Sequence, residues 1–203
     1  MPVIIDDIIQ GTPDWFAEKA GKISASNFSK IVTPTGQESK QWKGLAIELI
    51  DQLHNPDEQE PIDSKWLRRG IELEPEARSA YEFKTDYEVR QVGLIYLDER
   101  RNVLQSPDGL IDNNGQVEFK CPKGINHLWT LHNNDVPLEH KPQLQGQLWV
   151  GEREWNDFVS YHPVYPMFIK RVYRDENYIN LLKSSIEIFL DRMAKIEKEV
   201  INV

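Results

Sequence analysis

The sequence has a single cysteine, Cys121, among its 203 residues. One cysteine cannot form an intrachain disulfide, and its scarcity predicts a reducing compartment. It also excludes a zinc or iron–sulfur site built from several cysteines of one chain. Because Cys121 precedes a proline and matches no local signature of a nucleophile, we interpret it as a packing residue.

Long apolar runs are also missing. None approaches the roughly 20 residues that a membrane-spanning helix needs. The first residues, Met1 to Asp7, contain no basic region and no cleavage site, so we expect no signal peptide. The sequence therefore predicts a cytoplasmic protein with no membrane partner.

Positive charge is scarce, because 24 Lys and Arg residues face 33 Asp and Glu residues, which gives a net charge of −9. An acidic surface repels phosphate at long range, which argues against a protein that coats DNA. A DNA-processing protein of this composition needs its Lys and Arg residues concentrated where the DNA passes. The acidity suggests that DNA would be bound in an enclosed passage and not across the outer surface. Arg68 and Arg69 are the best candidates, since they lie one helical turn before Glu74.

Apolar residues are sufficient for a core, at 39% of the chain with six tryptophans. This length fits one domain, residues 1–203. The pattern predicts helices first, then a group of strands, a helix, two strands and a closing helix, which is a mixed α/β fold. The expected helices cover residues 13–20, 39–53, 64–84, 126–132, 141–150 and 176–200, with another opening at 24–26, and the expected strands cover 87–97, 103–105, 116–120, 155–161 and 167–173. Pro75 should kink or split the third of these helices.

The segment Ser106-Pro107-Asp108-Gly109 is followed by a predicted β-hairpin that ends in Glu118-Phe119-Lys120. The intervening Asp112-Asn113-Asn114-Gly115 is a turn signal, because Asn-Gly favours the positive φ of tight turns. Alternation along the returning strand places Glu118 and Lys120 on one face. The hairpin would bring Asp108 beside them.

Two ionised carboxylates about 4 Å apart repel by roughly 4 kcal/mol at an effective dielectric constant near 20. A proton or a cation must offset this repulsion, and oxygen ligands with open positions suit Mg²⁺ or Mn²⁺. Asp108 and Glu118 would then be ligands, with the backbone carbonyl of Phe119 as a further one, and Lys120 would act on a metal-bound water or on phosphate. The alternative is an ordinary surface hairpin whose charges face solvent.

These residues resemble the P-D…(D/E)-x-K nuclease signature, and in particular the phage lambda exonuclease family of recombination alkaline exonucleases. Three further blocks match that family in order. They are Trp15…Lys19-x-Gly21-Lys22-Ile23-Ser24-Ala25-Ser26, Trp66…Gly70-x-x-x-Glu74-x-x-Ala77-Arg78 and Pro142-Gln143-Leu144-Gln145-Gly146-Gln147-Leu148-Trp149-Val150.

The resemblance implies a restriction-endonuclease-like core, with a mixed central sheet flanked by helices. It implies that Asp108 and Glu118 bind Mg²⁺, that Lys120 is the catalytic lysine, and that Glu74 and Gln143 complete the site. It places Lys19, Ser26 and Ser106 where the family contacts a terminal 5′-phosphate. The family commonly has arginine at the position of Lys19, whereas lysine is a point charge without the planar fork.

The resemblance further implies a processive 5′-to-3′ exonuclease of double-stranded DNA that leaves 3′ single-stranded overhangs. The implied setting is recombination by a phage or prophage, with a ring-shaped homotrimer and a single-strand annealing protein as partner. Two other functions stay open from the residues: a DNA endonuclease of the same superfamily, and a non-catalytic DNA-binding scaffold.

Overall fold

The computed structural model describes residues 1–56 and 65–201, except for the side chain of residue 67. Six α-helices are present in these ranges: α1 Pro13–Lys19, α2 Trp42–His54, α3 Lys65–Thr85, α4 Gly124–Asn133, α5 Lys141–Val150 and α6 Glu176–Ile201. The 3₁₀ helices η1 Ala25–Lys30 and η3 Leu138–His140 accompany them. The strands are β1 Val3–Ile5, β2 Ile23–Ser24, β3 Leu94–Tyr96, β4 Val103–Gln105, β5 Gly109–Ile111, β6 Gly115–Lys120, β7 Trp155–Ser160 and β8 Phe168–Tyr173.

The strands form two mixed sheets of four. The first has the order β1-β3-β4-β2, with β2 parallel to β4, and the second has the order β5-β6-β7-β8, with β6 parallel to β7. Pro107 lies between β4 and β5 and has no N–H for a β-ladder, so the chain leaves one sheet after Gln105 and enters the other at Gly109. The bend between the sheets therefore holds Ser106 and Asp108.

The first helix begins as the sequence predicts. The Thr12 side chain accepts a hydrogen bond from Trp15 N, and Pro13 occupies the first turn, where a missing N–H costs nothing. The helix ends before Gly21, whose φ of +69° favours glycine. The next predicted helix is the short 3₁₀ helix η1, and Ser24 at its start makes no side-chain capping hydrogen bond.

One of the two outcomes predicted for Pro75 is wrong, because α3 continues through this residue and is not split there. Pro75 is exposed, so water can satisfy the carbonyl of Ile71 that a helical N–H would otherwise bond. The long strand expected at 87–97 is reduced to β3. Its first half makes only an isolated bridge, in which Arg90 N and Leu110 N donate to each other's carbonyls.

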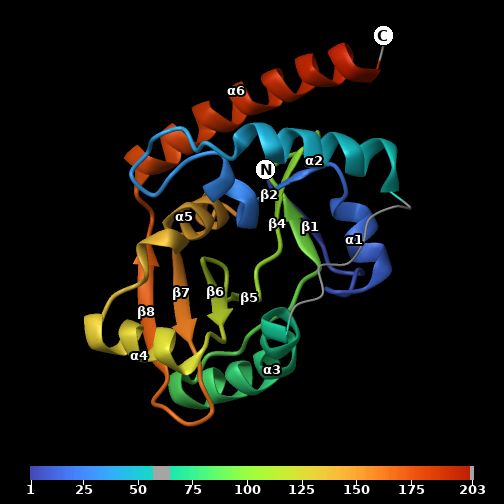
Figure 1. The fold of residues 1–203 in the computed structure, drawn as a ribbon. Helices are drawn as coiled ribbons and strands as arrows, with labels where there is room; N and C mark the ends of the chain where they lie inside the picture. The colour runs from blue at the N-terminus through green and yellow to red at the C-terminus, as the bar shows by residue number, and fades with distance from the viewer. Residues whose placement is uncertain (57–64, 202–203) are drawn as a thin grey trace.

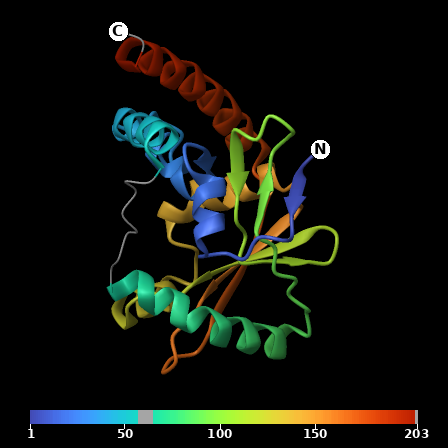
Figure 2. The same ribbon diagram turned by 90° about the vertical axis from the view of Figure 1, so that its right-hand side faces the viewer.

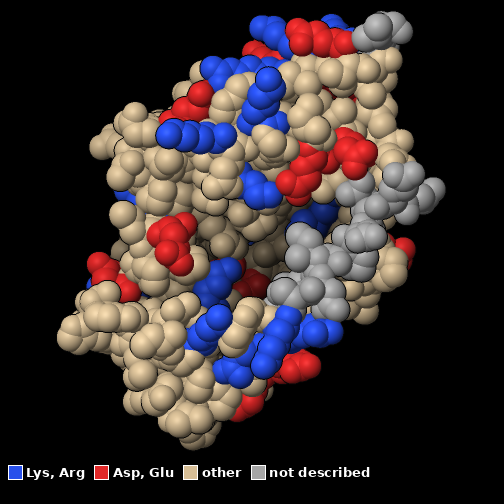
Figure 3. All heavy atoms as spheres, in the orientation of Figure 1, with Lys and Arg blue, Asp and Glu red and all other residues tan. Residues whose placement is uncertain are grey.

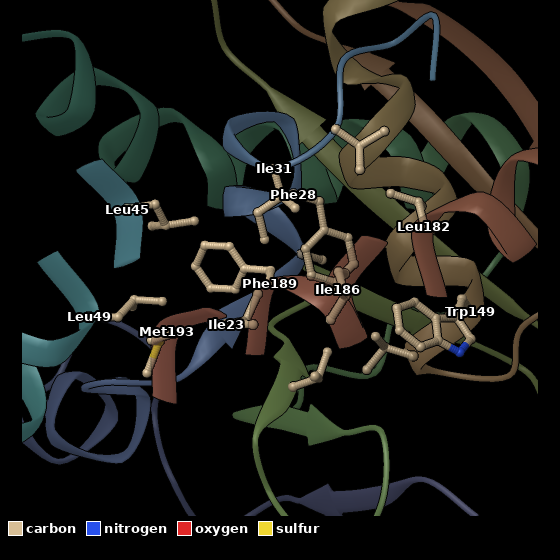
Figure 4. Packing of buried hydrophobic residues seen from close by; sticks show 14 of the residues in the cluster. Ile23, Phe28, Ile31, Leu45, Leu49, Trp149, Leu182, Ile186, Phe189 and Met193 are labelled. Atoms are coloured by element: carbon tan, nitrogen blue, oxygen red, sulfur yellow. The ribbon is translucent and has the colours of Figure 1, made fainter. Parts of the chain in front are cut away.

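The main core lies between α2, α6, η1 and α5. Figure 4 shows Phe28 of η1 and Trp149 of α5 meeting the apolar face of α6, to which Leu182, Ile186 and Phe189 belong. A second cluster packs α3 against the β5–β8 sheet through Tyr81, Val117 and Phe119 among others. In the described part of the chain, no helix combines the length and apolar character needed to cross a membrane.

Helices α6 and α2 cross one end of the molecule, and α3 and α4 lie at the opposite end (Figure 1). The two sheets stand between these ends, and the view turned by 90° shows the same arrangement (Figure 2). Strand β6 is one of the two inner strands of its sheet, with β5 on one side and β7 on the other. This position makes β6 the support for the residues described next.

Candidate active site

The β5–β6 hairpin brings Asp108 next to the Glu118 strand. Gly109 pairs with Val117, so Asp108, one residue earlier, lies level with Glu118. The Asp108 carboxylate accepts a hydrogen bond from Phe119 N at 2.6 Å. The bend at Pro107 and the hairpin register together fix Asp108 against β6, as expected from the predicted hairpin.

The turn of this hairpin is built differently from the expectation. The residue with positive φ is Asp112, at 47°, rather than Asn114 or Gly115. Gly115 is instead the first residue of β6, where an added Cβ would lie 2.1 Å from a ring carbon of Trp155. The glycine is thus needed for close packing against β7 and not for the turn.

Glu118 is only 3% exposed and is held by three side-chain donors. Lys120 Nζ and Gln143 Nε2 donate to its Oε1 atom at 2.5 Å and 2.7 Å. Gln147 Nε2 donates to Oε2 at 2.6 Å. The alternative of a hairpin with solvent-facing charges is therefore wrong for this residue.

Gln147 was missed from the sequence, where it resembles a solvated polar face together with Gln145. In the structure both glutamines are buried. Asn156 Nδ2 of β7 donates to Gln147 Oε1 at 2.9 Å, which orients the amide so that its NH₂ group points at Glu118. One signal was available, because Gln147 lies four residues after Gln143 and therefore on the same helical face.

Glu74 comes to the site from α3. It lines the same cleft as Asp108 and Glu118, and Arg78 donates to its Oε1 atom at 2.6 Å. Both partners lie on one helix at a spacing of four residues, which brings them side by side. The predicted acidic set is thus gathered on one cleft.

Crowding of negative charge shifts the pKa values of these groups. Burial raises the pKa of Asp108 well above its usual range, and the charges of Glu118 and Glu74 raise it further. Burial and the charge of Glu118 likewise raise the pKa of Glu74 against the opposing effect of Arg78. For Lys120, burial lowers the pKa, but the charges of Glu118 and Asp108 outweigh burial and raise it. The site holds more negative charge than Lys120 alone can compensate.

This donor set fits a hard divalent cation. Among the residues that the structure describes, no three His, Cys, Asp or Glu side chains are grouped closely enough to bind an ion without other ligands. Asp108 and Glu118 could supply two oxygen ligands, which leaves the remaining positions to a backbone carbonyl, water and substrate phosphate. Mg²⁺ is commonly bound in this way, through one or two carboxylates with several waters kept.

A second group of predicted residues surrounds Trp15. Trp15 Nε1 donates to Ser106 Oγ at 3.0 Å and to the carbonyl of Gly93 at 3.1 Å. Lys19 Nζ lies over the Trp15 ring, 3.6 Å from its centroid. Burial lowers the pKa of Lys19 to about 8, although the charge of Glu118 raises it, which places the ammonium group within the field of the carboxylates.

Ser26 and Ser106 each follow a strand of the first sheet. Strand β2 runs parallel to β4 with Ser24 opposite Leu104, and η1, which contains Ser26, begins directly after β2. Ser26 is exposed and donates to Ser24 Oγ at 3.2 Å. Of the three predicted phosphate contacts, Lys19 and Ser106 therefore share a contact with Trp15, whereas Ser26 contacts Ser24.

The carboxylates open into a cleft of about 820 Å³ between α3, the end of β6, α4 and η3. Figure 3 shows this face, where Lys and Arg atoms border a hollow that contains acidic atoms. Lys19, Ser26 and Ser106 are not among its lining residues, and neither are Arg68 and Arg69 of α3. Arg68 is exposed. The positive charge of Arg69 acts to lower the pKa of Cys121 and the pKa of His162.

Comparison with known proteins identifies the family. Residues 14–154 match the YqaJ-like viral recombinase domain. The chain belongs to this family. The matched range includes every residue predicted for the site, from Lys19 to Gln143.

Solved structures agree with the family assignment. The alkaline exonuclease LHK-Exo from Laribacter hongkongensis is 30% identical, with a TM-score of 0.85 over 93% of this chain and 96% of that chain. LHK-Exo in complex with dAMP gives 31% identity and a TM-score of 0.84 over the same shares. A phage-related exonuclease from Haemophilus somnus shares the fold at 14% identity, with a TM-score of 0.66 over 88% of this chain and 96% of that one.

The family and these structures confirm the predicted family resemblance, the predicted mixed α/β nuclease fold and the predicted class of enzyme, a deoxyribonuclease. An uncharacterized protein, R354 of Acanthamoeba polyphaga mimivirus, is 21% identical over 74% of this chain. The match covers only 29% of that viral protein, so the chain spans less than a third of its length.

Proposed function

We propose that this YqaJ-like protein is a Mg²⁺-dependent exonuclease that digests one strand of duplex DNA from its 5′ end and leaves 3′ overhangs for recombination. The observation that carries the proposal is the buried Glu118 carboxylate, held by Lys120, Gln143 and Gln147 beside Asp108. Membership in a recombination family and the likeness to an alkaline exonuclease support it. One such structure contains dAMP, the kind of mononucleotide that exonucleolytic digestion of DNA releases.

The residues of this chain have distinct tasks in hydrolysis. Asp108 and Glu118 would hold Mg²⁺, with the Phe119 carbonyl as a further ligand. When bound, the ion would supply a nucleophilic water and neutralise charge on the phosphate. Lys120 Nζ, 2.5 Å from Glu118 Oε1, stands where a protonated amine can orient that water or stabilise the phosphate as negative charge develops. Glu74 adds negative charge that strengthens cation binding.

Selection of the 5′ end would come from the group around Trp15. The Ser106 hydroxyl and the Lys19 ammonium both contact the same indole, and Ser26 lies in η1, which begins directly after the strand that pairs with β4. Ser106 is two residues from Asp108, so a phosphate held there lies near the bond to be cut. Arg68 and Arg69 would contact DNA from α3, outside the cleft.

Several features of this proposal stay predictions from the residues or from the resemblance. They are use of Mn²⁺ in place of Mg²⁺, a single domain over residues 1–203, a homotrimeric ring around DNA that gives processivity, a single-strand annealing partner, and action in the cytoplasm of a bacterial host.

The decisive experiment is digestion of linear duplexes labelled at either end, with and without a 5′-phosphate and Mg²⁺. We expect release of the 5′ label first, only with Mg²⁺, and faster with the phosphate. Asp108→Asn should abolish digestion, whereas Asp112→Asn, a change of an exposed carboxylate on the same hairpin, should not. Cleavage of a closed circular plasmid would indicate an endonuclease, and full activity of Asp108→Asn would refute the site.

A further inference from the structure

Helix α4 turns an apolar face outward. Its buried residues are His127 and Thr130, which face the protein. On the other side Ile125, Leu128 and Trp129 are 61%, 40% and 58% exposed. An apolar face of this kind on a surface helix commonly marks a binding site.

Trp129 joins this face to the catalytic cleft. It lines both the cleft and the shallow hollow formed with Ile125, Leu128 and His132. Asn126 and Asn133 line the cleft as well, one turn before and one turn after Trp129. An indole between two amides combines a stacking surface with groups that hydrogen-bond base edges and sugars.

A lysine, Lys123, lines the same cleft. Lys123 Nζ, just before α4, lies 4.1 Å from the centroid of the Trp66 ring on α3, and both residues line the cleft. The same cleft is also lined by Asp135 and Glu139, which disfavour a phosphate near them. This distribution favours a sugar–phosphate backbone along Lys120 and Lys123, with bases turned toward Trp129.

The volume of the cleft fits such an occupant. About 820 Å³ lies within the range of pockets that enclose drug-sized ligands, and it exceeds what one metal-bound phosphate needs. The residues proposed to bind the 5′ end, Lys19, Ser26 and Ser106, do not line it. A strand that starts among them and is cut at Asp108 and Glu118 would therefore continue into the cleft on the 3′ side of the cut.

We propose that Trp129 forms a nucleoside-binding subsite in which its indole stacks on a base or sugar on the 3′ side of the scissile phosphate, while Lys123 binds the adjoining phosphate. The subsite rests on the proposed DNA exonuclease function and adds a specific contact to it. It explains why an acidic protein leaves a large aromatic ring exposed beside its carboxylates.

The test measures DNA affinity in a catalytically silent background. Three proteins are compared: Lys120→Ala alone, Lys120→Ala with Trp129→Ala, and Lys120→Ala with Trp129→Phe. Fluorescence anisotropy measures the binding of each to a 5′-phosphorylated duplex in the presence of Mg²⁺. Loss of one stacked base weakens binding about 5- to 150-fold, so we expect a dissociation constant raised by this factor for alanine and by less for phenylalanine. Phe83→Ala is the matched control, because Phe83 is 90% exposed on α3 but does not line the cleft.

Kinetics with Lys120 intact give a second reading. Trp129→Ala should raise KM for linear duplex and change kcat little, because the lost contact exists before and during cleavage. An unchanged dissociation constant would overturn the proposal. Light scattering would measure the molar mass of each variant. If Trp129→Ala lowered the molar mass and DNA affinity fell only for that reason, the apolar face would bind a second copy of the chain and the proposal would be overturned. An inactive wild-type protein would refute the proposed function instead, so the two failures are distinguishable.

Discussion

At the scale of single residues, the controlling feature is the immobilised carboxylate of Glu118. Three donors fix both oxygens, and two of them come from one helical turn of α5. Lys120 is the donor that a divalent cation would displace or share, since it lies on the cleft side with Asp108. Gln147 is buried behind the carboxylate and determines where Oε2 points. We therefore expect it to act through Glu118 and not by contact with substrate.

Replacing Gln147 with leucine tests this positioning role. We expect metal affinity to fall about 10- to 100-fold, because the partners of metal ligands have effects of this size. Unfolding free energy should also fall by about 1–3 kcal/mol, since Asn156 Nδ2 loses its acceptor. Isothermal titration with Mn²⁺ measures the affinity and urea denaturation the stability.

Gln145→Leu is the control for this change. Gln145 is equally buried on the same helix, but it donates to the carbonyl of Tyr173 and accepts from Asp175 N. The Gln145→Leu variant should therefore be less stable than the wild-type protein but bind Mn²⁺ with the same affinity. An equal loss of Mn²⁺ affinity in both variants would show that Gln147 acts only through the stability of α5.

At the scale of elements, the position of α5 determines where the donors to Glu118 lie. A glycine in α5 allows the helix to pack at this position. Helix α5 packs on η1 so closely that a Cβ at Gly146 would lie 2.2 Å from a ring carbon of Phe28. The same helix carries Gln143 and Gln147. Close contact between η1 and α5 thus joins the main core to the Glu118 carboxylate.

Gly146→Ala should destabilise the protein by about 1–3 kcal/mol, because the Phe28 ring cannot give way in a packed core. Gly44→Ala on the exposed side of α2 meets no atom within 4 Å and should instead add about 0.5–1 kcal/mol. Thermal unfolding of the two variants measures both changes. Equal stability of the two alanine variants would contradict the close packing.

Much of this element plan was predictable from the sequence. Helix α5 and the hairpin have local signals, namely Pro142 near a helix start and alternation along β6. The partners of Gln147 and the burial of Glu118 were not predictable, because Asn156 and α5 reach β6 only through tertiary contacts. Family blocks pointed to Trp15, Glu74 and Gln143, whereas Trp129 had no local pattern that set it apart from core tryptophans.

At the scale of the whole molecule, the carboxylates link stability to pH and to metal. The folded state raises the pKa of Asp108 and Glu74, so between their ordinary and raised pKa values the folded protein holds more protons than the unfolded chain. Unfolding free energy must therefore fall as pH rises from about 4 through the raised values. A bound divalent cation would remove this loss by replacing the protons.

We expect Mg²⁺ to raise the unfolding temperature more at pH 8 than at pH 5, because protons compete for the same oxygens. Asp108→Asn should abolish most of the Mg²⁺ effect and lessen the fall of stability with pH. Calorimetric scans at both pH values, with and without Mg²⁺, measure this. Stabilisation by Mg²⁺ that is equal at both pH values and in the variant would exclude the carboxylates as the cause.

The order of the site along the chain has a consequence for biosynthesis. Asp108 and Glu118 leave the ribosome before the segments that complete their surroundings, since Gln143 and Gln147 come later and β7, which pairs with all of β6, later still. A nascent chain that ends between residues 121 and 142 has the carboxylates and Lys120 but lacks Gln143, Gln147 and all of β7. Products of interrupted translation in this range would therefore lack nuclease activity.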